Sequence, residues 1–291
     1  MDLAFWGFRH WPFDRTFAAD RFFASQQHEE ALARMLFLVE ESRRCGVVMG
    51  LGGSGKSFLL KLLQDRTERL GRLTARCDAT GLDGNELLGQ IALSCQAPVD
   101  HEATPARLWN GLRARFAALA LIRQPLVILI DHFDLVEPSC LQAVWRLHQL
   151  ADSVGLKMTI LLATRERQVA PVLQELVELR IEISSWTAAE TAQFIQTATR
   201  HAGSKQILFS DEACRSIYKM THGVPSAVVS LSSHCLLAAQ GQEETLVTQE
   251  CVEAVAAEFW PHTAKSTPMD PGRKRESRHP FRPAAFAPLG R

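Results

Sequence analysis

The segment Gly50-Leu51-Gly52-Gly53-Ser54-Gly55-Lys56-Ser57 constrains the fold of this chain more than any other feature. It matches the pattern G-x-x-x-x-G-K-[ST], in which glycines let the backbone wrap closely around phosphate oxygens. The backbone N–H groups then point inward at a helix N-terminus, where they bind anions. Such a loop requires a strand before it and a helix after it. The apolar run 46–49 predicts the strand, and the helix is predicted by the spacing of Phe58, Leu59, Leu62 and Leu63.

The loop predicts a nucleotide site with assigned roles. Lys56 is expected to reach the β- and γ-phosphates, and the Ser57 hydroxyl to ligate Mg²⁺. ATP and Mg²⁺ are therefore the expected substrate and cofactor. The predicted nucleotide-binding residues are Gly50, Gly52, Gly53, Ser54, Gly55, Lys56, Ser57 and Phe58.

Length and composition are those of an ordinary globular protein. The 291 residues are enough for one large domain or two modest ones, and 32 basic residues balance 32 acidic residues. The whole molecule therefore gives no electrostatic reason to expect nucleic acid or an anionic membrane as a partner.

We expect no signal peptide and no transmembrane segment. The seven cysteines are scattered and form no C-x-x-C pair, which favours a reducing compartment, so we predict a cytoplasmic protein.

Apolar runs alternate with helical patterns up to about residue 186. Strands are predicted at residues 46–49, 73–77, 126–131, 158–163 and 179–183. None of them alternates with polar residues, which indicates a parallel sheet covered on both faces. The predicted fold is thus an α/β P-loop NTPase with a five-stranded parallel sheet. From Thr187 the pattern is helical only, and it predicts an all-helical lid subdomain.

Four segments follow from this pattern. Residues 1–24 are rich in aromatic side chains and are expected to pack on the core, with a wall for the adenine ring as the alternative. Residues 25–186 form the predicted nucleotide-binding core, and residues 187–260 the helical lid. Residues 261–291 are basic and rich in proline, and are predicted to be disordered. A solvating role for this tail is favoured over contact with nucleic acid, lipid or a partner.

The second half of the predicted site follows the strand 126–131. Asp131 ends this strand, where a carboxylate holds Mg²⁺ in nucleotide hydrolases. Ser57 and Asp131 are therefore the predicted metal ligands. Asp134 is the first candidate for orienting the attacking water and His132 the second, while a turn-capping role for Asp134 stays open.

Other polar residues near strand ends have less defined roles. Thr164 follows a strand predicted to lie between those of the phosphate loop and Asp131, so it is a candidate to contact the γ-phosphate or its water. Asp78 follows the second strand and is expected to cap a loop or support the site. Three arginines are candidates to reach a neighbouring subunit's nucleotide, although a solvated role is favoured for each: Arg165, Arg167 and Arg180.

Together these residues resemble the AAA+ ATPases of the general secretion pathway protein A (ExeA-type) family. The similarity covers the N-terminal aromatic segment, the helix start His28–Arg34, the phosphate loop, Ile130-Asp131 and the turn Gly223-Val224-Pro225. The resemblance implies an AAA+ fold with a helical lid and ATP hydrolysis. It also implies a catalytic glutamate after Asp131 and a nucleotide-sensing arginine after Pro225, where this chain has His132 and Ser226. We expect no counterpart of that family's membrane span and peptidoglycan-binding region, so a role at the cell wall is not carried over from the resemblance.

Three functions are consistent with these observations. The first is an ATPase that uses hydrolysis to move the lid against the core, acting on a protein partner or within an oligomer in secretion or envelope assembly. The second is a nucleotide-dependent switch with weak hydrolysis, favoured by His132 and Ser226. The third is a DNA-associated ATPase resembling transposition and replication initiator proteins, for which only the basic tail is an argument.

Overall fold

A computed structural model describes residues 2–14, 19–99, 104–165 and 170–259. Five parallel strands form one sheet in the order β2-β3-β4-β1-β5. They are β1 (Cys45–Gly50), β2 (Leu73–Asp78), β3 (Leu126–Asp131), β4 (Met158–Thr164) and β5 (Val177–Ile183). The predicted α/β class, the strand number and the parallel arrangement are confirmed.

The strand order brings the predicted site residues to one edge of the sheet. β4 lies between β1 and β3, as predicted, and Met49 of β1 is in register with Thr164 of β4. Asp78 of β2 is likewise in register with Asp131 of β3. All these residues lie at the carboxyl ends of their strands, the edge at which open α/β sheets bind ligands.

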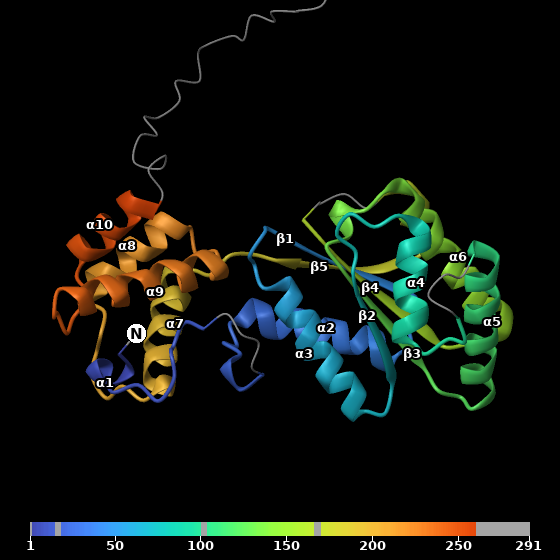
Figure 1. Cartoon of the computed structure of the whole chain (residues 1–291), viewed down its shortest axis with the longest axis horizontal. Coiled ribbons are helices and arrows are strands. Elements are labelled where there is room, and N and C mark those ends of the chain that lie inside the picture. Colours follow the sequence, from blue (N-terminus) through green and yellow to red (C-terminus); the bar gives the residue numbers. More distant parts are fainter. Residues whose placement is uncertain (1, 15–18, 100–103, 166–169, 260–291) are drawn as a thin grey trace, which may run out of the picture.

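Helices cover both faces of the sheet (Figure 1). On one face lie α2 (Gln26–Glu40) and α3 (Lys56–Arg69), and on the other α4 (Gly84–Ser94), α5 (Pro105–Leu121) and α6 (Pro138–Val154). Neighbouring strand residues point to opposite faces. Val48 therefore packs with α2 and α3, whereas Val47 packs with the other layer. This two-sided burial explains the uninterrupted apolar runs of β1, β3 and β4. The prediction that no strand alternates with polar residues is wrong for β5, an edge strand on which Glu178, Arg180 and Glu182 are exposed.

Local sequence signals set most helix boundaries. Ser25 caps α2 by accepting the His28 N–H, and Asp83 forms a capping box with Glu86 at the start of α4. α2 ends at Glu40, and two residues later Ser42 adopts a left-handed conformation with φ of 50°. Three short 3₁₀ helices were not predicted: η1 (Ala19–Arg21), η2 (Phe133–Leu135) and η3 (Pro171–Leu173).

The residues after β5 form a separate helical subdomain, left in Figure 1. It consists of α7 (Ala188–Ala202), α8 (Asp211–Thr221), α9 (Pro225–Gly241) and α10 (Gln249–Phe259). A capping box of Thr187 and Glu190 opens α7, and Ser210 caps α8. These helices enclose their own apolar core, which includes Ile195, Ile217 and Leu231.

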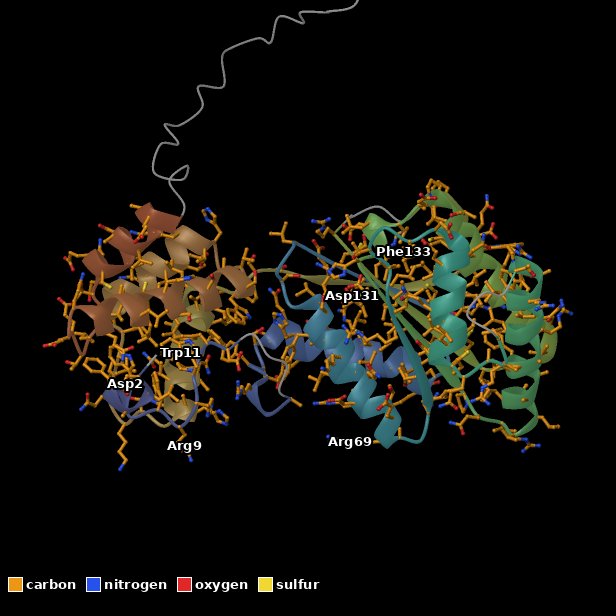
Figure 2. The ribbon with its side chains drawn as sticks, viewed as in Figure 1. Asp2, Arg9, Trp11, Arg69, Asp131 and Phe133 are labelled. Carbon is orange, nitrogen blue, oxygen red and sulfur yellow. The ribbon has the colours of Figure 1, made fainter. Side chains whose placement is uncertain are left out.

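The N-terminal aromatic segment packs differently from the prediction. Its helix α1 (Leu3–Trp6) lies against the helical subdomain, and Trp6, Phe8 and Phe13 are buried in that subdomain's core. Trp11 donates its indole N–H to Ser233 Oγ of α9 at 2.8 Å (Figure 2). The expected packing on the α/β core is therefore wrong for residues 2–13. The physical reason is size: four short helices enclose little apolar surface, and these aromatic side chains complete their core.

Within the described residues, no helix has the length and apolar character needed to cross a membrane. The predicted basic tail at 261–291 and Arg167 lie outside the described residues.

The buried side chain of His148, on α6, is expected to make the stability of the folded protein sensitive to acid. Its side chain is 2% exposed, and burial lowers the pKa of its imidazole to about 4, although Asp152 and Glu178 act in the opposite direction and Arg44 reinforces the shift. Because the folded pKa lies below the unfolded value of about 6.5, the unfolded state binds more protons in this window, and stability falls as pH drops from 6.5 towards 4. His148 alone should remove about 2 kcal/mol of unfolding free energy between pH 7.5 and pH 5.

Urea denaturation at both pH values tests this expectation. His148→Leu should reduce the loss of stability between pH 7.5 and pH 5 by about 2 kcal/mol. His201→Leu, at an exposed position on α7, is the matched control and should leave the loss unchanged. An equal loss in wild type and His148→Leu would contradict the assignment.

Candidate functional site: a phosphate-binding loop between core and lid

The predicted phosphate loop joins β1 to α3. Gly53 and Gly55 have φ angles of 79° and 98°, a region that side chains with a Cβ rarely adopt. Close neighbours also require glycine here. A Cβ on Gly50 would lie 2.6 Å from the Ile183 carbonyl oxygen, and one on Gly55 would lie 2.9 Å from His28 Nε2. The loop is thus a backbone cradle whose shape excludes side chains.

Lys56 is held inside this cradle. It begins α3 and is buried, and its Nζ donates to the carbonyl oxygens of Gly50 and Leu51, each at 2.8 Å. Burial lowers the pKa of the ammonium group, while the charges of Asp134 and Asp131 work to raise it and that of Arg165 lowers it. The structure therefore brings both predicted carboxylates into the electrostatic environment of Lys56.

His28 supports the loop from α2, a role that sequence reasoning did not assign. Its Nε2 lies 2.9 Å from the Ser54 carbonyl oxygen and its Nδ1 lies 2.6 Å from Ser25 Oγ. A carbonyl oxygen only accepts, so Nε2 carries the proton and Nδ1 accepts from the Ser25 hydroxyl. Burial lowers the pKa of this imidazole, which keeps it neutral at pH 7. The only signal for His28 in the sequence was its place in the resemblance segment 28–34.

Two contacts complete the surroundings of the loop. Ser54 Oγ is buried and has no hydrogen-bond partner among the described residues. Phe58, predicted to bind nucleotide, lies on α3 and stacks on Phe22, with ring centroids 5.8 Å apart. An orphaned hydroxyl inside a cradle of glycines and a lysine fits a phosphate ligand.

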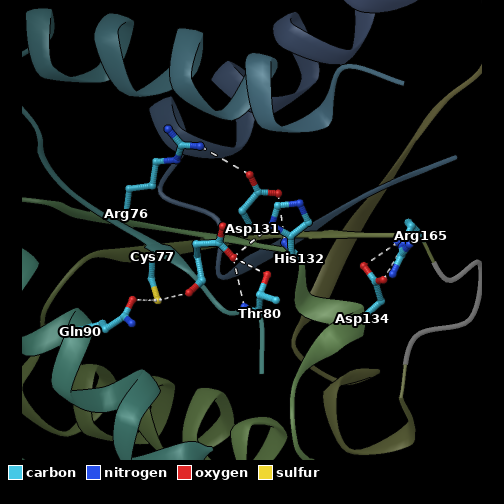
Figure 3. Close-up of polar contacts among 9 residues, drawn as sticks. Arg76, Cys77, Thr80, Gln90, Asp131, His132, Asp134 and Arg165 are labelled. Atoms are coloured by element: carbon cyan, nitrogen blue, oxygen red, sulfur yellow. Dashed lines mark hydrogen bonds and ion pairs between the residues drawn. The ribbon is translucent and has the colours of Figure 1, made fainter. Parts of the chain in front are cut away.

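Asp131 ends β3 and is nearly fully buried, as expected for a Mg²⁺-holding carboxylate. Its Oδ1 accepts the His132 backbone N–H at 3.0 Å, and its Oδ2 lies 3.5 Å from Arg76 Nη2 (Figure 3). Arg76, on β2, was not predicted to take part. A buried carboxylate whose charge acts on Lys56 provides the oxygen and charge that a phosphate-bound Mg²⁺ requires.

His132 and Asp78 form a pair at the carboxyl ends of β3 and β2. His132 has a left-handed backbone with φ of 53°, and its Nδ1 lies 3.1 Å from Asp78 Oδ1 (Figure 3). Asp78 also accepts from the Thr80 hydroxyl and backbone N–H, so it both caps a loop and contacts the site. The ring is directed towards β2, away from the loop-bearing strand β1.

Asp134 lies in η2 and is bound by Arg165. Arg165 Nε is 2.6 Å from Asp134 Oδ2, and its backbone N–H donates to Oδ1 at 3.0 Å (Figure 3). Burial opposes the charge of Asp134, but these bonds outweigh it and hold the pKa of the carboxyl below its ordinary value. Asp134 is thus an ionised, oriented carboxylate near Lys56.

The remaining predicted residues occupy different positions. Thr164 is buried at the end of β4. Arg180 is exposed on the edge strand β5. A pocket of about 190 Å³ adjoins Asp134 and Thr164, but its lining comes from strand ends, η2, η3 and α6 and includes no residue of the loop. It is therefore not the phosphate site.

The helical subdomain contacts the loop directly. Ser226, in the first turn of α9, donates its backbone N–H to the Gly53 carbonyl oxygen at 3.1 Å. A Cβ on Gly53 would lie 1.9 Å from Ser226 Oγ. This is the position at which the resemblance implies an arginine. The helical lid thus contacts the phosphate loop through Ser226 and Gly53.

This combination of sheet order, loop and lid agrees with the comparisons with known proteins. A family profile described as "AAA domain" matches residues 39–169. Residues 39–169 of the core are therefore similar to an AAA domain. The chain is also 23% identical over 250 residues to general secretion pathway protein A of Aeromonas hydrophila, across 82% of this chain and 45% of that protein. The predicted resemblance is confirmed, and this chain spans less than half the length of that relative.

Solved structures with the same fold extend the likeness to the lid. The ORC1 protein of Aeropyrum pernix, in complex with DNA, is similar with a TM-score of 0.67 and 18% identity, over 87% of this chain and 70% of that one. Cdc6p of Pyrobaculum aerophilum has a TM-score of 0.63 and 16% identity, over 89% and 71%. RuvB of Thermotoga maritima has a TM-score of 0.56 and 14% identity, over 85% and 73%. At these identities the likeness shows an AAA+ fold.

Proposed function

We propose that this AAA+ protein binds ATP with Mg²⁺ and hydrolyses it, and that the cycle moves the helical subdomain against the core. The observation that carries the proposal is the contact of Ser226 with Gly53, because it places the lid on the loop that surrounds the phosphates. A ligand in the loop acts directly on this contact, so lid position and nucleotide state are coupled.

The residues have distinct roles in this proposal. Lys56 and the loop N–H groups bind the β- and γ-phosphates, and Ser57 and Asp131 would hold Mg²⁺. When bound, Mg²⁺ supplies charge that stabilises the phosphate oxygens in the transition state. Asp134, with His132 as second candidate, orients a water that attacks the γ-phosphorus and accepts the proton that this water loses. The bond to the β–γ bridging oxygen breaks, which yields ADP and inorganic phosphate. Thr164 contacts the γ-phosphate or this water.

We place this activity in the cytoplasm, in secretion or envelope-associated assembly, with another protein or further copies of the chain as partner. The support is the likeness to general secretion pathway protein A and the seven cysteines, all of which are buried free thiols that suit a reducing compartment.

A second candidate is a nucleotide-dependent switch that hydrolyses ATP slowly. The observation that favours it is that both candidate water-orienting groups have other partners: Asp134 is bound by Arg165, and His132 is paired with Asp78. Carboxylate oxygens accept more than one hydrogen bond, so Asp134 keeps capacity for a water. Turnover therefore decides between the two candidates.

Phosphate release and fluorescent-ATP binding, measured on the same preparations, test both candidates. Asp134→Asn should reduce turnover by about 10²-fold, the scale of a lost proton acceptor, and leave ATP binding within a factor of a few. Asp152→Asn, an exposed aspartate on α6, is the control and should match wild type. If Asp134→Asn turned over normally and His132→Ala did not, His132 would be the water-orienting group. Tight binding by wild type without turnover would establish the switch.

A further inference from the structure

Arg76 of β2 and Asp131 of β3 lie on the same face of the sheet, the face that α3 covers. The strand register aligns Arg76 with Leu129, and Asp131 follows two residues later on the same face. Thr74, two residues before Arg76, shares a hydrogen bond with Thr67 of α3, with 2.9 Å between their hydroxyl oxygens. Because α3 is the helix that follows the phosphate loop, Arg76 is on the side of the sheet that carries this helix.

The guanidinium of Arg76 contacts one carboxylate oxygen of Asp131. Arg76 Nη2 lies 3.5 Å from Asp131 Oδ2, while Oδ1 accepts the His132 backbone N–H at 3.0 Å (Figure 3). The Asp131 side chain is 3% exposed, whereas that of Arg76 is 30% exposed. Charge-assisted N–H···O bonds are ordinarily about 2.7–2.9 Å long, so this contact is loose. A buried carboxylate is thus paired with a weakly held, partly exposed cation.

The buried carboxylate of Asp131 requires positive charge nearby. Removing a carboxylate from water costs free energy, which a neighbouring cation offsets. The charge of Asp131 also acts on Lys56, but Lys56 Nζ donates to the carbonyl oxygens of Gly50 and Leu51. Arg76 therefore supplies the positive charge that is in contact with this carboxylate.

Mg²⁺ and the guanidinium of Arg76 are attracted to the same carboxylate. Two cations beside one carboxylate repel each other, and the doubly charged ion has the stronger attraction to it. The arginine side chain is long and partly exposed, so its charged end can turn into water while its stem stays packed. Of the two cations, the guanidinium is therefore the one that is displaced.

We propose that Arg76 competes with Mg²⁺ for Asp131 and thereby sets the affinity of the site for the metal. The inference rests on the proposed function, since it takes Asp131 as a ligand of Mg²⁺. Arg76 neutralises the carboxylate when no metal is held and turns towards solvent when metal binds. Metal alone consequently binds weakly. Metal together with ATP binds well, because the phosphates add oxygen ligands and negative charge that outweigh the lost ion pair.

Binding of Mn²⁺ to the full chain without nucleotide, measured by electron paramagnetic resonance, tests the competition. Arg76→Gln should tighten Mn²⁺ binding about 10-fold, the scale of one hydrogen bond between charged groups. Arg76→Lys keeps the positive charge and should stay close to wild type. The gain should be absent when Arg76→Gln is combined with Asp131→Asn. Arg115→Gln is the matched control and should bind Mn²⁺ like wild type, because Arg115 is also partly buried but donates its Nε–H to the Cys95 carbonyl oxygen, at 2.7 Å.

Thermal unfolding distinguishes this role from a structural one. In EDTA, Arg76→Gln should melt at a lower temperature than wild type, because its buried carboxylate has lost a cation, and the difference should vanish in Mg-ATP. An arginine with a structural role alone would cause the same loss in both solutions, and that result would overturn the proposal. Unchanged or weaker Mn²⁺ binding by Arg76→Gln, or a gain that persists with Asp131→Asn, would overturn it as well. Failure of the proposed function has a different signature, since Mg-ATP would then leave the melting temperature of the wild type unchanged.

Discussion

Replacing Lys56 with alanine is expected to abolish ATP binding and to reduce phosphate release by about 10²-fold or more, the scale of a lost electrostatic contact to a transition state. The ammonium group is the buried cation inside the loop and is bound by the carbonyl oxygens of Gly50 and Leu51. Its removal takes away both the charge that meets the phosphates and the bonds that hold the loop closed. Two losses at one residue make this the largest functional effect expected in the chain.

Titration with a fluorescent ATP analogue and a phosphate-release assay measure the effect of Lys56→Ala. Lys157→Ala is the control, because Lys157 is an exposed lysine just before β4, at the opposite end of the strands from the loop. It should bind and hydrolyse like wild type. Normal binding by Lys56→Ala would show that the loop does not hold nucleotide, and the proposed function would be wrong.

The second large effect is expected for Gly53→Ala, which should separate the lid from the loop. The new Cβ would overlap Ser226 Oγ at 1.9 Å and approach Ser226 Cβ at 2.9 Å, and φ of 79° adds about 1–2 kcal/mol of strain. Part of this overlap is relieved by rotation of the Ser226 hydroxyl, but the Cβ contact remains. The variant should lose most of its ATP affinity and show greater protease sensitivity in the linker 184–187.

Two further variants separate the effect of backbone strain at Gly53 from the effect of its contact with Ser226. Gly155→Ala has a similar φ of 70° with no heavy atom within 4 Å of the new Cβ, so it should lose stability by about 1 kcal/mol and bind ATP normally. The double variant Gly53→Ala with Ser226→Gly removes the overlap but keeps the backbone strain, and should recover part of the binding. If the double variant were no better than Gly53→Ala, the contact between lid and loop would not be the cause.

The sequence allowed much of the fold to be predicted because its signals are local. The apolar run of β3, the glycine spacing of the loop and the capping box of Thr187 each depend on residues within a few positions of one another. The order of β4 between β1 and β3 was also predicted and is confirmed. The predicted position of the aromatic segment 2–13 was wrong. Aromatic side chains can pack on any apolar surface, and the sequence alone does not show which of the two apolar cores receives them.

The fine structure of the site required distances between residues far apart in sequence. Arg165 reaches Asp134 across 31 positions, and His28 reaches Ser54 across 26. Neither contact can be recognised from a pattern in the local sequence, because strand order and helix packing bring the two residues of each pair together. Arg76 beside Asp131 is a similar case, separated by 55 positions and joined only by the register of β2 with β3.

The N-terminal segment gives the helical subdomain a second attachment to the core. The chain begins within that subdomain, crosses to the core by Phe22, which stacks on Phe58 of α3, and returns after β5. The chain therefore passes twice between the helical subdomain and the core. In the proposed function, movement of the helical subdomain would act on residues 53–58 at two places, at Gly53 through Ser226 and at Phe58 through Phe22.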